Sequence, residues 1–141
     1  MSDNSIDAAT QVIADQIATM LGETEEHPRF QIARIVQVCG VAFAEKMVRR
    51  TFETEENGGL MVVDGSRRRT VGGVFFYHVK GYLRSRRRKK KWRLRIVEMA
   101  DVFPDLATLV EEEQKKFEER QARRAQEQPA QNESSSAPAE Q

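Results

Sequence analysis

Two pairs of adjacent glycines interrupt a chain whose apolar residues otherwise recur at helical spacing. Residues 58–59 and 72–73 are both Gly-Gly, and they enclose three consecutive arginines at 67–69. Glycine lets the backbone turn where other residues are strained, and the arginine guanidinium matches the geometry of phosphate oxygens. The sequence therefore predicts helices on both sides of one structured basic loop that binds anions.

Helical periodicity accounts for most of the chain outside this loop. Apolar residues three and four positions apart lie on one face of a helix, and glycines and prolines mark where a pattern stops. The predicted helices cover residues 5–21, 28–39, 41–55, a stretch that begins after Gly73, the stripe 92–103 and the charged segment 105–124. Strand character in Leu60–Val63 and a turn signal at Asp64-Gly65 predict a small hairpin or another structured loop. The predicted fold class is all-α, a compact bundle of five or six short helices.

Charge is strongly segregated along the sequence. The net charge is only +1, yet the segment from Ser66 to Arg95 contains thirteen lysines and arginines and no acidic residue. All 22 acidic residues therefore lie elsewhere in the 141-residue chain. Such segregation predicts one strongly positive surface that attracts a polyanion, although the protein as a whole is nearly neutral.

The length suits one domain with a tail. We expect residues 1–4 to be disordered, 5–103 to form the folded domain, 104–125 to form a charged helix and 126–141 to be a disordered tail without a large hydrophobe. Cys39, the only cysteine, is expected to be buried as a small hydrophobe. No stretch approaches the roughly 18 consecutive apolar residues of a membrane span. We therefore expect an intracellular protein, cytoplasmic, or nuclear in a eukaryote.

The loop and its surroundings resemble a known family. Asn57-Gly58-Gly59, a hydrophobic stretch, the run from Asp64 to Thr70 and Gly72-Gly73-Val74-Phe75 before a helix are similar to the RNA-binding domain of the phosphorylated adaptor for RNA export. The resemblance extends more weakly over residues 29–56 and fades after Leu83. Val71 stands where the family usually has proline, and the run 86–91 is more basic than the family's continuation. The resemblance implies a domain that prefers single-stranded RNA, held mainly through backbone charge with little base readout.

The candidate RNA-binding residues combine positive charge with aromatic rings. Arginine binds phosphate bidentately, dense charge attracts nucleic acid through counterion release, and glycine N–H groups before a helix can approach an anion. The candidates are Arg67, Arg68, Arg69, Thr70, Gly72, Gly73, Lys80, Arg84, Arg86, Arg87, Arg88, Lys89, Lys90, Lys91, Phe76 and Tyr77. Phe75 and Tyr82 are assigned to the core, which leaves Phe76 or Tyr77 to stack on a base. Trp92 could also stack on a base, but it fits the apolar stripe and is expected in the core.

Several alternatives accompany this hypothesis. The run 86–91 also suits a mobile arm or a nuclear localisation signal. The charged C-terminal helix has opposite charges at helical spacing and suits a protein-interaction module, and the basic surface suits DNA as well as RNA. No spacing matches a metal site, no nucleophile lies beside a base and no nucleotide-binding glycine motif is present. Neither an enzyme nor a cofactor is therefore expected.

Overall fold

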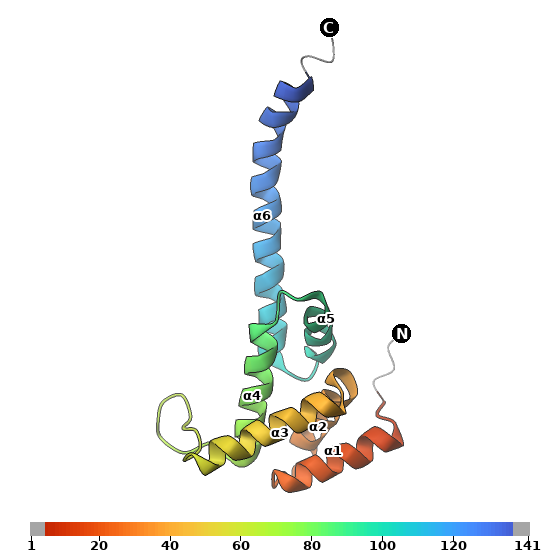
Figure 1. Cartoon of the computed structure of the whole chain (residues 1–141), viewed down its shortest axis with the longest axis vertical. Coiled ribbons are helices and arrows are strands. Elements are labelled where there is room, and N and C mark those ends of the chain that lie inside the picture. The colour runs from red at the N-terminus through yellow and green to blue at the C-terminus, as the bar shows by residue number, and fades with distance from the viewer. Residues whose placement is uncertain (1–4, 137–141) are drawn as a thin grey trace.

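The computed structural model describes residues 5–136, with side chains as far as residue 127, and consists of six α-helices (Figure 1). The helices are α1 (Ala8–Met20), α2 (Glu26–Cys39), α3 (Val41–Glu56), α4 (Val71–Ser85), α5 (Lys90–Met99) and α6 (Pro104–Ser136). The described range has no β-strand, and the predicted hairpin is reduced to one isolated bridge between Met61 and Arg68. The all-α prediction is confirmed.

Side-chain caps determine where two of the helices begin. The carboxylate of Asp7 accepts the N–H of Thr10 at 2.8 Å and starts α1. The hydroxyl of Thr70 accepts the N–H of Gly73 at 3.1 Å and starts α4. The prediction that this helix begins after Gly73 was therefore wrong, because its first residue is Val71. Both glycines of the second pair lie in the first helical turn rather than in the loop.

The core forms where the apolar stripes of the first five helices meet. Helix α2 packs against α1, α3 and α5, while α4 packs against α3 and α5. The largest fully buried side chains include Phe75, Ile32, Ile35, Met47, Leu83 and Met99. Full burial of side chains of this size contributes about 1.5–3 kcal/mol each to folding. Cys39 is buried as predicted, and burial raises the pKa of its thiol to about 12.

Helix α6 docks by its first turns and then leaves the bundle (Figure 1). Leu106 and Leu109 are buried, whereas every residue from Gln114 to Glu127 is exposed. The helix was predicted to end near Arg124 but continues to Ser136. Residues 126–136, which were predicted to belong to a disordered tail, are therefore helical. The ends predicted to be disordered at 1–4 and 137–141 lie outside the described residues. No helix in the described range is both long and apolar enough to cross a bilayer.

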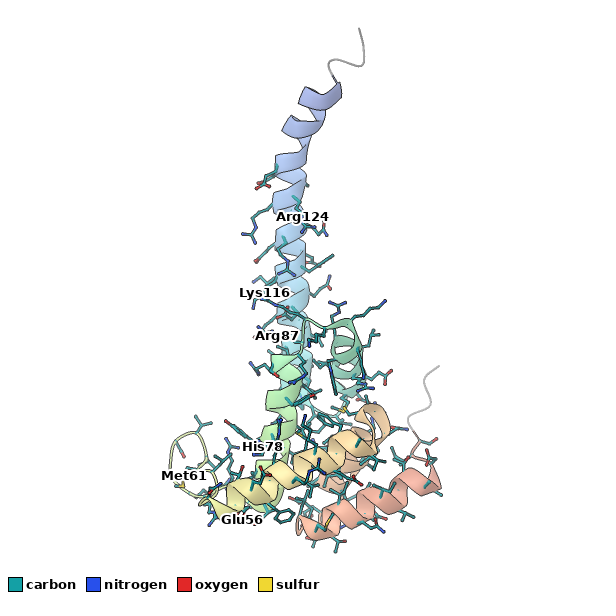
Figure 2. The ribbon with its side chains drawn as sticks, in the orientation of Figure 1. Glu56, Met61, His78, Arg87, Lys116 and Arg124 are labelled. Carbon is teal, nitrogen blue, oxygen red and sulfur yellow. The ribbon has the colours of Figure 1, made fainter. Side chains whose placement is uncertain are left out.

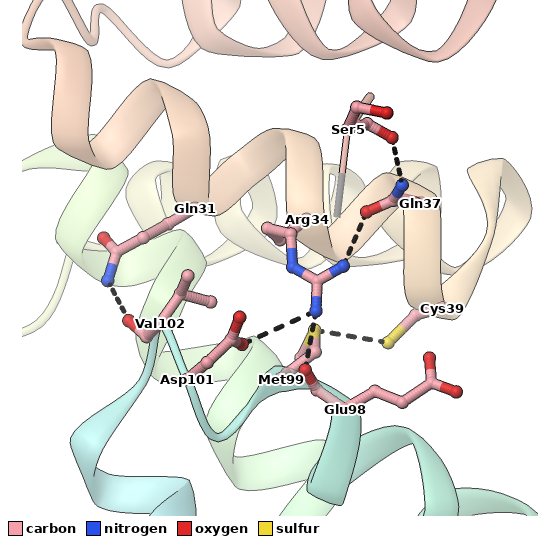
Figure 3. Close-up of polar contacts among 9 residues, drawn as sticks. All are labelled: Ser5, Gln31, Arg34, Gln37, Cys39, Glu98, Met99, Asp101 and Val102. Carbon is pink, nitrogen blue, oxygen red and sulfur yellow. Dashed lines mark hydrogen bonds and ion pairs between the residues drawn. The ribbon is translucent and has the colours of Figure 1, made fainter. Parts of the chain in front are cut away.

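A buried arginine joins α2 to the end of α5 (Figure 3). Arg34 is only 5% exposed. Its guanidinium donates to the carbonyl oxygen of Glu98 and to Oε1 of Gln37, each at 2.6 Å, and lies 3.5 Å from a carboxylate oxygen of Asp101. Nearby, Gln31 donates to the carbonyl oxygen of Val102 at 2.8 Å. The bond to Gln37 lies within α2, whereas the contacts with Glu98, Asp101 and Val102 attach α2 to the end of α5 and to the turn that leads into α6.

We expect Arg34→Met to lower the free energy of unfolding by about 1–3 kcal/mol, because it removes charge-assisted hydrogen bonds and leaves the Glu98 carbonyl without this donor. Urea denaturation of the full chain measures the change. Arg49→Met is the matched control, since Arg49 is exposed on α3, and its effect should stay within about 0.5 kcal/mol. Equal stability of the two variants would show that the Arg34 bonds do not hold α2 to α5.

Candidate nucleic-acid interface

The loop between α3 and α4 is folded by backbone hydrogen bonds. The N–H of Arg69 donates to the carbonyl of Leu60 at 2.6 Å, and the N–H of Val62 donates to the carbonyl of Arg67 at 2.9 Å. Gly65, with φ of +73°, closes the turn, and its N–H donates to the carbonyl oxygen of Val62 at 2.8 Å. The loop projects from the end of α3, where Figure 2 labels Glu56 and Met61. The three arginines are therefore presented on a defined backbone.

Arg68 is committed to the loop's own structure. Its guanidinium pairs with the carboxylate of Glu55 at 2.5 Å and lies against Gly59. A Cβ at position 59 would overlap that guanidinium, and Gly59 also has φ of +78°, which side-chain-bearing residues rarely adopt. Gly59 is thus required both for the turn and for the approach of Arg68. Of the three consecutive arginines, Arg68 is the one whose charge is already neutralised.

The other two arginines of the loop are placed differently. Arg67 is exposed. Arg69 donates from Nε to the carbonyl of Met61 at 3.2 Å, and its guanidinium lies 5.3 Å from the ring centroid of Tyr77. Tyr77 is 49% exposed on α4, whereas Phe76 packs against Phe103 with ring centroids 5.8 Å apart. Tyr77 is consequently the ring with a free face, and Phe76 belongs to the edge of the core.

The start of α4 is occupied by an internal carboxylate. Gly72 is buried, and the carboxylate of Glu23 lies so close to it that any Cβ at position 72 would overlap it. A negative charge is stabilised at this end of a helix by the helix dipole. The hydroxyl oxygen of Thr70 accepts the hydrogen bond from the N–H of Gly73, as described above. Thr70, Gly72 and Gly73 therefore build the helix start, and the carboxylate of Glu23, from the α1–α2 connection, lies against Gly72 where a phosphate was expected.

Three aromatic rings from three helices form a cluster beside α4. Phe43 of α3, Tyr82 of α4 and Trp92 of α5 have ring centroids separated by 5.1 to 5.4 Å. Phe43 is buried, but Tyr82 and Trp92 are only partly buried. Both were assigned to the core from the sequence. They do pack against the core, and each also keeps part of its ring accessible.

Five cations surround the accessible parts of these rings. The guanidinium of Arg86 lies 3.7 Å from the centroid of Tyr82, with Lys46 at 5.1 Å and Arg50 at 5.6 Å. Around Trp92, Arg95 lies at 4.7 Å and Lys91 at 5.8 Å. Attraction between a cation and the face of an aromatic ring keeps such side chains in place. We call Tyr82, Trp92 and these five cations, together with Tyr77 and Arg69, the aromatic–cation surface.

A hollow of about 220 Å³ connects the two parts of this surface. Tyr77 and Tyr82 line it together with Arg50, and Gly81, which has no side chain, leaves space between the rings. His78 also faces the hollow, and its Nε2 lies 2.8 Å from the hydroxyl of Thr54. Burial of the ring, helped by the nearby charge of Arg50, lowers the pKa of His78. The hollow therefore combines a neutral imidazole near pH 7 with cationic and aromatic walls.

The opposite flank of α4 carries basic residues that contact α6. Lys80 pairs with Asp105 at 2.9 Å, and Arg87, just beyond the helix, pairs with Glu113 at 2.6 Å. Hydrogen bonds from these cations lower the pKa of both carboxyl groups. Figure 2 shows Arg87 beside α6. Two of the predicted RNA-binding cations are thus already paired with internal carboxylates.

The structure divides the predicted site residues between these two flanks. Arg69, Tyr77, Arg86 and Lys91 belong to the aromatic–cation surface, whereas Phe76, Lys80 and Arg87 face the C-terminal part of the chain. Arg84, Arg88, Lys89 and Lys90 are exposed near the α4–α5 connection. The sequence hypothesis omitted Lys46, Arg50 and Arg95. Lys46 and Arg50 do share the polar face of α3, but only the fold shows that this face adjoins Tyr82.

Part of the chain is similar to known proteins. A family model described as the RNA-binding domain of phosphorylated adapter RNA export protein matches residues 13–97. Proteins of that name from Mus musculus and Homo sapiens are each 43% identical, over 72 and 68 residues. The one from Bos taurus is 40% identical over 74 residues.

The alignments cover about half of this chain but only a small part of each relative. The three alignments cover 51%, 48% and 52% of this chain, but 18%, 16% and 18% of the relatives, so the chain spans less than a fifth of their length. The family model extends beyond Leu83, where the resemblance was expected to fade, and includes α2 to α4, most of α5 and part of α1. The chain therefore belongs to the family of the RNA-binding domain of phosphorylated adapter RNA export protein.

Proposed function

We propose that this domain binds single-stranded RNA across the aromatic–cation surface, chiefly through the phosphate backbone and with little sequence readout. The observation that carries the proposal is the convergence of Lys46, Arg50 and Arg86 on the ring of Tyr82. Three cations at one place favour a polyanion, and a partly accessible ring among them favours an unpaired base. Membership of an RNA-binding family supports RNA as the polyanion.

The shape of the surface favours single strands over duplexes. Bases can stack on protein rings only when they are unpaired and turned outward. Tyr77 and Tyr82 lie on either side of a small hollow that is open above Gly81. In the proposed complex the backbone follows the cations from Arg69 past Arg86 toward Arg95, and one or two bases contact these rings. Stacking accepts any base, which accounts for the weak sequence preference in the proposal.

A binding comparison tests the proposal. Fluorescence anisotropy with single-stranded RNA, single-stranded DNA and duplex RNA of equal length should give the tightest binding to single-stranded RNA. If about five phosphates are neutralised, log K against log[salt] should have a slope near −3.5, at roughly −0.7 per contact on a single strand. A slope near zero, or tighter binding of duplex RNA, would contradict the proposed mode. Equal binding of RNA and DNA would indicate a general single-strand binder.

We expect the double variant Arg50→Ala, Arg86→Ala to weaken binding of single-stranded RNA by more than about tenfold, because it removes two of the cations around Tyr82 while leaving the fold intact. The matched control is Arg123→Ala, Arg124→Ala, which removes the same charge from the exposed part of α6. Circular dichroism verifies that both variants are folded. If the control loses as much affinity, binding depends on overall charge and not on this surface.

Removing the carboxylates that pair with the other flank of α4 should have the opposite effect. Asp105→Asn together with Glu113→Gln frees Lys80 and Arg87 for RNA, and we expect about two- to fivefold tighter binding, since exposed ion pairs are worth up to about 1 kcal/mol. The control Glu111→Gln, Glu112→Gln makes the same charge change at exposed positions of α6. An equal gain in both variants would attribute the effect to net charge alone.

A further inference from the structure

A groove lies between α5 and α6, apart from the aromatic–cation surface. It has a volume of about 600 Å³, and its lining combines five apolar side chains from the two helices with six polar or charged ones. Ile96 and Leu109 form its buried floor, while Val97 and Phe117 remain 51% and 49% exposed on its sides. We call it the α5–α6 groove. No side chain in the described part of the chain covers Val97 and Phe117 further, although both face the same hollow.

The rim of the α5–α6 groove is basic. Arg88, Arg93 and Arg120 line it, and among the residues described none of the three has an ion-pair partner. Arg87 also lines the groove, but it forms an ion pair with Glu113. An apolar floor between unpaired arginines is complementary to an amphipathic helix that carries carboxylates along the edges of its apolar face.

We propose that the α5–α6 groove binds an acidic amphipathic helix of a protein partner. Hydrophobic residues of that helix would cover Val97 and Phe117, and its carboxylates would pair with Arg93 and Arg120. Aliphatic side chains neither stack on bases nor bond to phosphates, so the floor favours a protein ligand over RNA. A second copy of this chain is a poor occupant, because Phe117 is followed on α6 only by polar residues, alanines and one proline.

The groove also extends beyond the segment that matches the family model. The matched segment ends at residue 97, and α6, which supplies Leu109, Phe117 and Arg120, lies after it. The site is therefore assembled from the family domain and an additional helix. Beyond the groove, α6 continues away from the bundle (Figure 2).

A peptide-display selection on the full chain tests this inference. The library encodes helix-forming peptides of about 18 residues, roughly five turns, with randomised positions on every face. We expect the enriched peptides to carry an apolar stripe bordered by Asp or Glu. Val97→Glu with Phe117→Glu should weaken the best peptide by at least about tenfold, and so should Arg93→Glu with Arg120→Glu. The matched control, Val12→Glu with Met20→Glu, changes exposed apolar residues on α1 and should have no effect.

The selection can also overturn the inference. It is wrong if no peptide is enriched, if the enriched peptides are not acidic, or if they bind the Val97→Glu, Phe117→Glu variant as well as the original chain. Circular dichroism shows that each variant is folded. Single-stranded RNA is added as a competitor to the Arg50→Ala, Arg86→Ala variant, whose α5–α6 groove is unchanged: displacement of the peptide from this variant would assign the groove to RNA. Unchanged peptide binding in the presence of RNA supports a separate protein site.

Discussion

The burial of one stripe of α4 orients everything else that this domain presents to a ligand. Phe75, Val79 and Leu83 have no exposed surface, so the rotation of the helix about its axis is fixed by the core. The residues on either side of that stripe then point in different directions, because helical geometry separates them by a fixed angle. One flank carries Tyr82 and meets α3 and α5, and the other carries Lys80 and meets α6. The burial of this stripe thereby places Tyr82 and Lys80 on different sides of the helix.

The internal carboxylates explain how so basic a segment coexists with a nearly neutral chain. Glu55, Asp105 and Glu113 each pair with a cation of the basic segment, and Glu23 lies at the start of α4. These acids leave uncompensated charge mainly around Tyr82 and Trp92 and near the α4–α5 connection. In the proposed complex, the distribution of unpaired cations rather than their number determines which surface attracts the RNA strand.

The helices could be predicted from the sequence because their apolar spacing is regular and their ends carry glycine or proline. The start of α4 was missed because Thr70 caps it, and a lone threonine before two glycines also suits a turn. Arg68 resembled its two neighbours, since nothing local shows that Glu55, thirteen residues earlier, returns to meet it. The aromatic–cation surface combines residues from three helices, the loop before α4 and the α4–α5 connection, so no local pattern could predict its composition in full.

The outer part of α6 makes the domain much longer in one direction than the helical bundle alone. From Phe117 to Ser136 the helix rises about 1.5 Å per residue, which extends it by roughly 30 Å. It leaves the bundle as a narrow rod with mixed charges and little apolar surface (Figure 1). In the proposed complex such a rod would act as a steric spacer between two domains bound to neighbouring stretches of one RNA strand. The length of α6 would then limit how densely the strand is covered.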